Sequence, residues 1–302
     1  MLRRCPRFLR PFWLLIWLAF SVGNAFAAEL LRPYVLSSHS RGDFVKTIIE
    51  VKEALMAGGF ELAGEYTPYA DAHVIVVTNA YLKQQVLDDG NLAFALGQRV
   101  SITRLNDRIQ VAYTNPDYFQ NAYRIAGSMS PVRQALEKVL GRQETFGAKG
   151  LAVEKLRRYQ YSYGTEYFDD QLVLAEYQDQ EQALRIVQSA LDHHAGGVHT
   201  VYRIDVPERP VAVFGVALTL DFGGDETIMD ALDRTTLRHT ARLPYEIVVE
   251  RGRVIALHPR FRLGIDFPDM KMVGHQSVTS LREAPAAITR ALFAAAGNGE
   301  NM

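Results

Sequence analysis

The sequence predicts a chain of the α/β (α+β) class, built as two similar sheet-plus-helix domains that arise from an internal duplication. Short apolar runs with strand character alternate with amphipathic helical segments along most of the 302 residues. A strand-like run and a pair of glycines recur at one constant offset, at Tyr34 and Gly58 in the first half and at Leu172 and Gly196 in the second. Each half also contains one hairpin signature that ends in a residue followed by proline.

The first 27 residues have the composition of a signal peptide. Four arginines precede the apolar run 12–20, and the small-residue sequence Ala25–Ala27 follows it. The apolar run is far shorter than the roughly 20 residues that a membrane-spanning helix needs. We therefore expect cleavage near Ala28, export to the periplasm and no stable membrane span after processing.

Removal of this peptide changes the chemistry that the chain can carry out. Cys5 is the only cysteine, so the mature chain can form neither a disulfide nor a thiolate metal site. Losing the four arginines leaves 29 of the 33 basic residues against 34 acidic ones, and the net charge falls from −1 to −5. An acidic chain lacks the basic surface of a nucleic-acid-binding protein, so we expect no nucleic-acid partner.

The first domain is expected to span residues 29–150. Its helices carry apolar residues three and four positions apart, and its strands are continuously apolar or alternate with period two. Asp43 and Ser130 are N-cap residues for two of the helices. In chain order the expected elements are a strand at 34–39, a helix from 44 to the glycines at 58 and 59, a strand at 74–77, a helical segment at 81–96, a hairpin with strands at 100–105 and 108–114, and a helix after 130.

A tyrosine-rich hinge, residues 151–170, is expected to lead into a second domain of the same type at 171–296. The last residues, 297–302, contain glycine and asparagine but almost no apolar side chain, so we expect a disordered tail. In chain order the expected elements of the second domain are a strand at 172–177, a helix that ends before 196, a strand at 211–216, a helical segment at 225–237, a hairpin with strands at 245–250 and 253–257, and a helix from 285.

The order strand, helix, strand, helix, hairpin, helix, stated twice, resembles the bacterial domain of unknown function family numbered 302. The resemblance implies a small α/β fold in each half and brings no established activity. It transfers no thiol-dependent role, because the cysteine that often opens the family hairpin is Gln98 in one half and Tyr245 in the other. The resembling residues are Ala54–Glu61, the strand that ends at Asn79, Asn115 and Pro116, Leu243–Tyr245, and His258 and Pro259.

The segments that leave the two hairpins, 115–128 and 258–280, are predicted to be the least regular parts of the mature chain and to form the functional surface. Both combine aromatic side chains with a few charged ones, which is typical of a small-molecule pocket. The alternative is that these aromatic side chains fill the ends of the sheets or bury a domain interface. The candidate ligand-binding residues here and in the hinge are Tyr118, Tyr123, Arg124, Tyr161, Tyr163, Arg260, Asp269 and His275.

The hinge itself has two interpretations. If it is extended, Tyr159, Tyr161 and Tyr163 lie on one face, which could stack a planar ligand or pack between the two domains. Packing between domains is favoured for a segment that joins them. The nearby acids Glu166, Asp169 and Asp170 could serve acid/base chemistry or hold a hard cation, but solvated loop acids are the favoured interpretation.

Two clusters raise the question of a metal. Met270, Met272 and His275 could hold a cuprous ion in an oxidising compartment, or the methionines could simply pack against the sheet. His193 and His194 end a helix, where a cationic side chain opposes the helix dipole, and adjacent positions point about 100° apart. The helix-end interpretation is favoured for the histidines.

The chain contains no phosphate-binding glycine loop with lysine, no Gly-x-Ser-x-Gly and no His-Glu-x-x-His. We therefore expect an exported, non-catalytic module that binds a small molecule or another envelope protein. The alternatives are an enzyme that uses loop aspartate and histidine residues, and a copper-handling protein that uses the 270–275 segment. No motif names a cofactor or an oligomeric state.

Overall fold

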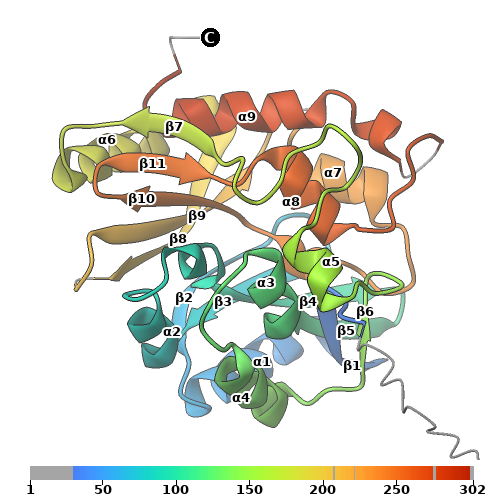
Figure 1. Ribbon diagram of the computed structural model, residues 1–302. Helices are drawn as coiled ribbons and strands as arrows, with labels where there is room; N and C mark the ends of the chain where they lie inside the picture. Colours follow the sequence, from blue (N-terminus) through green and yellow to red (C-terminus); the bar gives the residue numbers. More distant parts are fainter. Residues whose placement is uncertain (1–29, 207, 221, 275–276, 300–302) are drawn as a thin grey trace, which may run out of the picture.

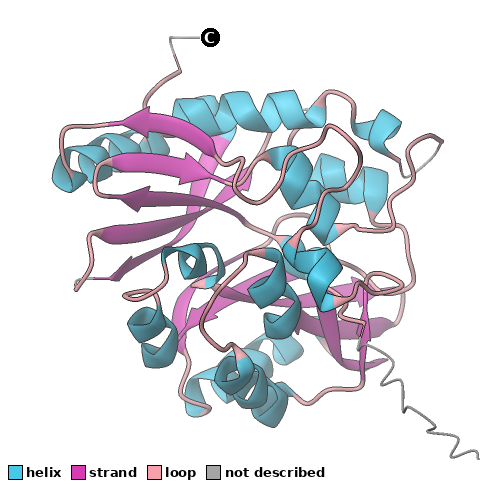
Figure 2. Cartoon of the chain, in the orientation of Figure 1, coloured by secondary structure: helices cyan, strands magenta, loops and turns pink. Residues whose placement is uncertain are grey.

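A computed structural model describes residues 30–206, 208–220, 222–274 and 277–299, and the expected signal peptide lies outside these ranges. Within them, eleven strands form one sheet whose paired strands run antiparallel, with helices packed on it (Figures 1 and 2). The predicted mixture of α and β structure is confirmed. No helix among the described residues is long and apolar enough to cross a membrane.

The first half of the chain forms two hairpin-linked strand pairs and their covering helices. The backbone N–H of Lys46 donates to the Asp43 carboxylate (2.7 Å), so the predicted N-cap of the first helix is confirmed. The prediction for Ser130 is wrong, because Met129 is the N-cap of that helix and no side chain caps it. Asn106 adopts a positive φ of 56° in the predicted hairpin turn. The elements are β1 (Tyr34–Arg41), α1 (Phe44–Ala57), β2 (Glu61–Tyr66), β3 (Ala72–Thr78), α2 (Ala80–Gln85), the 3₁₀ turn η1 (Gly90–Ala95), β4 (Gln98–Leu105), β5 (Arg108–Thr114), α3 (Pro116–Ala122), α4 (Ser130–Leu140) and β6 (Glu144–Phe146).

The second half follows a short helix, α5 (Val153–Arg157), and repeats much of this order. The Asp179 carboxylate caps its first long helix by accepting from the backbone N–H of Gln182 (2.8 Å). The elements are β7 (Leu172–Glu176), α6 (Gln180–Asp192), η2 (Ala195–Gly197), β8 (Val198–Val206), β9 (Val211–Leu218), α7 (Asp225–Leu232), η3 (Thr240–Arg242), β10 (Tyr245–Glu250), β11 (Arg253–Ala256), α8 (Pro259–Asp266), η4 (Val278–Leu281) and α9 (Ala284–Ala295).

The strand order across the sheet is β6-β1-β5-β4-β3-β2-β8-β9-β10-β11-β7. Read outward from the centre, β2-β3-β4-β5-β1 on one side matches β8-β9-β10-β11-β7 on the other. The two sides meet where Gly64 of β2 pairs with Tyr202 of β8. A Cβ atom at Gly64 would lie 2.2 Å from the carbonyl oxygen of Val201, so this close approach of the strands requires glycine.

Helices cover the outer faces of the sheet, and short turns fill its centre. In Figure 1, α1 and α4 lie beneath the strands of the first half, whereas α9 lies above those of the second and α6 lies at the left, level with β7 and β11. Near the centre, η1 packs on β9 and β10, while η3 packs on β3, β4 and β5. Each half therefore helps to cover the sheet of the other, and the main hydrophobic core runs through both.

The segments that leave the two hairpins are helices, contrary to the prediction that they are irregular. Asn115 and His258 are the N-caps of α3 and α8, and a proline occupies the first helical position of each. Proline suits this position because its missing N–H has no partner there and its fixed φ is already helical. The residue-proline pairs therefore start helices directly after the hairpins.

Three strands were not predicted, namely β2, the short β6 and β8, although β8 carries a clear signal. β8 alternates in burial, with Tyr202, Ile204 and Val206 facing the core. β2 has no such alternation, and it is the strand that joins the two sides of the sheet. The helical segments predicted at 81–96 and 225–237 are shorter than expected. The first is divided into α2 and η1, and the second contains only α7.

The predicted disordered tail is held in place as far as the structure describes it. The Asn298 side-chain amide donates to the carbonyl of Leu174 in β7 (3.0 Å), and its backbone N–H donates to Phe293 (3.0 Å). Residues 297–299 thus extend the end of α9 along the sheet, and 300–302 lie outside the described residues.

Candidate functional site

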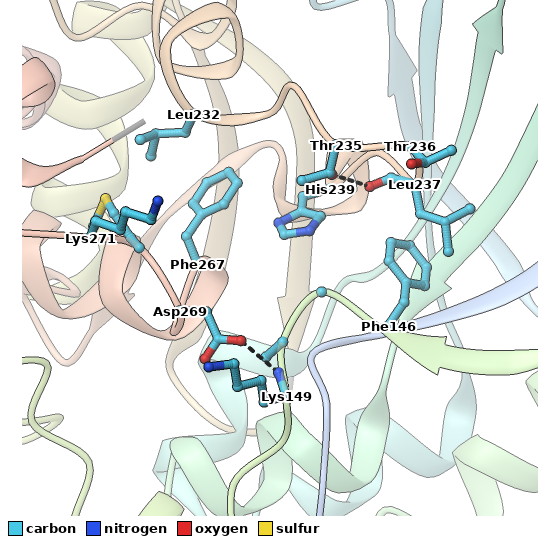
Figure 3. Close-up of a pocket in the computed structure, with 13 residues that line it drawn as sticks. Phe146, Lys149, Leu232, Thr235, Thr236, Leu237, His239, Phe267, Asp269 and Lys271 are labelled. Atoms are coloured by element: carbon cyan, nitrogen blue, oxygen red, sulfur yellow. Dashed lines mark hydrogen bonds between the residues drawn. The ribbon is translucent and has the colours of Figure 1, made fainter. Parts of the chain in front are cut away.

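A pocket of about 550 Å³ opens where three segments of the chain meet, and we call it the junction pocket (Figure 3). The segments are the loop after β6, the connection between α7 and η3, and the residues that follow α8. One comes from the first half of the chain and two come from the second. The lining residues are Phe146, Gly147, Ala148, Lys149, Leu232, Thr235, Thr236, Leu237, His239, Phe267, Asp269, Met270 and Lys271.

Aromatic rings build the floor of the junction pocket. The His239 ring stacks on Phe267, with centroids 4.8 Å apart and an interplanar angle of 24°. It also contacts the rings of Tyr34 (5.0 Å) and Phe146 (6.0 Å). The Arg242 guanidinium lies 5.7 Å from the Phe267 centroid. These contacts hold the rings in place without a ligand.

His239 lines the pocket, but its Nδ1 is not exposed to it. The side chain is buried, and Nδ1 has neither accessible surface nor a hydrogen-bond partner among the described residues. Burial lowers the pKa of His239 to about 4, although the Asp266 carboxylate and a hydrogen bond to the Asp266 backbone raise it in part. The imidazole is therefore neutral at pH 7.

Asp233 follows the lining residue Leu232 and holds the backbone of His239 in position. The backbone N–H of His239 donates to Asp233 Oδ2 (2.8 Å), while Oδ1 is buried without a partner among the described residues. Burial raises the pKa of Asp233 to about 7, and the hydrogen bond from His239 and the charge of Arg238 oppose this shift only in part. Near neutral pH this carboxyl group is thus partly protonated.

The rim of the junction pocket carries two cations and one anion. Lys149, Asp269 and Lys271 are exposed, and the backbone N–H of Lys149 donates to Asp269 Oδ2 (2.7 Å). In the described part of the chain neither lysine ammonium takes part in an ion pair. The rim therefore has a net positive charge in a chain whose overall charge is negative.

No protein-family model, curated protein or solved structure matches the chain. The chemistry of the junction pocket is therefore inferred from its own residues. Among the described residues no group of three or more His, Cys, Asp or Glu side chains could hold a metal ion.

Some of the predicted site residues do come together at the pocket. Asp269 and Met270 line it, and the Tyr161 hydroxyl donates to the backbone carbonyl of Met270. Met270 packs partly against the core, whereas Met272 is half exposed. The third predicted copper ligand, His275, lies outside the described residues.

Tyr118 and Tyr123 are core residues and do not line the pocket, contrary to their predicted role. Both lie on the buried face of α3 and its end, and both are fully buried. The Tyr123 ring stacks on Phe168 of the hinge (5.7 Å, 26°). Because Phe168 also contacts Phe94 and Phe261, it packs between the two halves, as the packing interpretation of the hinge expects.

The remaining candidates fasten the hinge to the helices or face solvent. Arg124 forms an ion pair with Asp169, and Arg260 forms one with Glu166 (3.1 Å). Tyr163 is fully exposed, whereas Tyr159 is buried, so the hinge tyrosines do not share one face. The segment contains α5 followed by turns and is not extended.

A buried group of five charged side chains lies at the junction of the two halves, and we call it the ion cluster. Each member is at most 2% exposed. Glu246 binds both Arg99 (2.5 Å) and Arg262, and Asp266 binds Arg262 (2.9 Å) and Arg242 (3.1 Å). Sequence reasoning missed this cluster, because nothing in spacing or composition brings β4, β10, η3 and α8 together.

The backbone carbonyls at the C-terminal end of α8 accept hydrogen bonds from side chains of the first half of the chain and of the hinge. The hydroxyls of Tyr159, Tyr118 and Tyr34 donate to the backbone carbonyls of Gly264 (2.8 Å), Ile265 (2.8 Å) and Asp266 (3.2 Å), respectively. Carbonyls in the last turn of a helix have no partner within the helix, so these tyrosines take the place of a C-cap.

Proposed function

We propose that the chain is an exported, non-catalytic protein that binds a small organic molecule in the junction pocket. The observation that carries this proposal is a preformed aromatic pocket, in which the His239 ring stacks on Phe267 and contacts Phe146. Aromatic rings favour stacked or edge-to-face contact with another ring. The volume of the pocket falls in the range of roughly 300–1,000 Å³ that is usual for small-molecule sites.

Binding is favoured over catalysis by the surroundings of His239. A general base or nucleophile needs a partner that activates it, and a catalytic imidazole works best with a pKa near the operating pH. The pKa of His239 is about 4, and its backbone, not its ring, contacts Asp233. The rim acid Asp269 accepts from a backbone N–H and has no histidine beside it among the described residues.

We further propose that the two halves, 29–150 and 171–296, arose by internal duplication and that each is a member of the domain of unknown function family numbered 302. The support is the order of elements, which is similar in both halves, and the mirrored strand order on the two sides of the β2–β8 contact. Export to the periplasm rests on the arginines and the apolar run of residues 1–27.

Native mass spectrometry of the mature protein, purified under mild conditions, tests the proposed function. We expect an adduct of a few hundred daltons on the wild-type protein. Thr236→Trp places an indole at the exposed rim of the pocket, and this variant should lose the adduct. Gln134→Trp, on the exposed side of α4, is the matched control and should retain it.

An adduct that survives Thr236→Trp contradicts the proposal, because the molecule then lies elsewhere. So does a protein that carries no adduct and whose melting temperature no member of a small-molecule library raises. N-terminal sequencing of the same material tests export, since processing should leave an N-terminus near Ala28.

A further inference from the structure

We infer that the molecule held in the junction pocket is a small organic anion whose acid group sits on a planar apolar body. This inference rests on the proposed function of the pocket. It assigns each part of the ligand to one part of the site: the acid to the rim and the planar body to the aromatic floor.

The rim selects the charge. Lys149 and Lys271 bring two ammonium groups, neither of them in an ion pair among the described residues, against the single carboxylate of Asp269. Asp269 is already engaged by the backbone N–H of Lys149, which leaves it less able to attract a ligand cation. A cleft lined by one excess charge concentrates the opposite charge from solution. One acid group on the ligand would neutralise the rim.

Backbone contacts hold the main-chain positions of these two lysines. The hydrogen bond from Lys149 to Asp269 joins the loop after β6 to the segment after α8, and Lys271 pairs with Ser277 in an isolated bridge. Figure 3 shows Lys271 beside Leu232 and Phe267 on one side of the pocket and Lys149 with Asp269 below. The side chains of Lys149 and Lys271 therefore extend from two different segments that border the same pocket opening.

The floor selects the body. Phe146 and Phe267 lie on either side of His239, and Leu232 and Leu237 complete the walls (Figure 3). Aromatic rings favour stacked or edge-to-face contact with another ring, beyond the gain from burying apolar area. A ring or a similarly flat apolar group fits this floor better than a flexible sugar or peptide, whose hydroxyl and amide groups would lose their water without new partners.

The uncharged floor fixes the orientation of the ligand. Because burial lowers the pKa of His239 to about 4, its ring is neutral at pH 7 and gives an anion no charge to pair with. The acid group of the ligand therefore points out to the lysines, and the planar body lies on the floor.

Two fluorescent probes that differ only in charge test this assignment. Anilinonaphthalene sulfonate and phenylnaphthylamine share an aromatic body and an N–H, but only the first carries an acid group. We expect the wild-type protein at low ionic strength to bind the sulfonate about fivefold more tightly, as two exposed ion pairs provide, and added salt to reduce this preference. Thr236→Trp should abolish the binding of both probes.

Paired lysine substitutions show whether the rim causes the preference. In Lys149→Met/Lys271→Met the two probes should bind within about twofold of each other. Lys138→Met/Lys155→Met removes the same charge from exposed positions outside the pocket and should keep the fivefold preference. In the wild-type protein, hydroxybenzoate should displace the sulfonate, whereas hydroxybenzamide at the same concentration should not.

The outcomes separate this inference from the proposed function. If Thr236→Trp blocks both probes but the wild-type protein binds them equally, the pocket is still a binding site. The inference that it selects an anionic ligand is then wrong. If neither probe binds in a way that Thr236→Trp blocks, both conclusions fail. If the double lysine variant loses the neutral probe as well, the lysines shape the pocket and do not select charge, which overturns the inference.

Discussion

The ion cluster and the junction pocket lie at the same meeting of the two halves, and they treat charged groups in opposite ways. In the ion cluster every charged group has an ion-pair partner and almost no contact with water, although Arg99 Nε and Asp266 Oδ1 have no hydrogen-bond partner among the described residues. At the pocket the charges are exposed, and the ammonium groups form no ion pair among the described residues. One region pairs its charges with each other, and the other leaves them open to a ligand.

The largest effect should come from breaking the ion cluster. Glu246→Gln removes the carboxylate that binds both Arg99 and Arg262, and leaves two buried guanidinium groups with one carboxylate fewer. Removing one member of a buried ion pair typically costs about 3–5 kcal/mol of unfolding free energy. Urea unfolding followed by circular dichroism should show a loss of that size.

Glu176→Gln is the matched control for this substitution. It removes the same charge from an exposed ion pair with Arg253, where we expect a change of at most about 1 kcal/mol. If Glu246→Gln costs no more than Glu176→Gln, the ion cluster does not hold the two halves together.

The next effect is a pH dependence beside the pocket. Burial raises the folded-state pKa of Asp233 to about 7 from its ordinary 3.8. Between these values the folded protein holds a proton that the unfolded chain has released, so this contribution to stability is lost as pH rises through that window. Asp233→Asn does not titrate, so its unfolding free energy relative to that of the wild-type protein should rise by about 2.7 kcal/mol from about pH 5 to about pH 8.5.

Urea unfolding of both proteins at the two pH values measures this gain. His239 works in the other direction, because its pKa is lowered to about 4 and its contribution is lost as pH falls below its ordinary 6.5. It is present in both proteins, so it largely cancels in the comparison. A stability difference that does not change with pH would mean that Asp233 titrates normally.

A smaller effect should link the two regions through Phe267, which stacks on His239 and also contacts the Arg242 guanidinium. Phe267→Leu keeps an apolar side chain but loses both ring interactions, at a cost of about 1 kcal/mol in unfolding free energy. The same variant should bind both naphthalene probes more weakly. Phe261→Leu, in the core away from the pocket, should lose similar stability and keep the binding of both probes.

The smallest effect should come from the rim of the pocket. Lys149→Met/Lys271→Met removes two exposed charges that form no ion pair among the described residues, so its unfolding free energy should lie within about 0.5 kcal/mol of the wild-type value. Thermal unfolding monitored by circular dichroism measures this. A clear loss of stability would place the lysines with the ion cluster and not with a binding site.

Local patterns in the sequence predicted most of the fold. Both hairpins, with β4 and β5 and with β10 and β11, lie within two residues of their predicted bounds, because period-two alternation and turn residues are local signals. The Asp43 cap is equally local. β2 was missed because its residues are partly exposed and show no alternation, and its position depends on pairing with β8, more than a hundred residues away.

The candidate site was less predictable. Asp269 and Met270 were reached through the general signal of aromatic and charged residues near a hairpin. Tyr118 and Tyr123 gave the same signal, but α3 turns them into the core. His239 stands in a connection with no motif of its own, and it becomes part of a site only because β6 of the first half lies beside it.

The three tyrosine hydroxyls at the end of α8 bear on the order in which the chain folds. During synthesis the first half and the hinge appear before α8, so the tyrosines that donate to its last carbonyls are already made when that helix appears. A fragment that begins after the hinge would have to fold with those carbonyls unsatisfied and with Glu246 facing one arginine fewer. The early part of the chain thus acts as a template for the late part, and the two halves are not exchangeable modules.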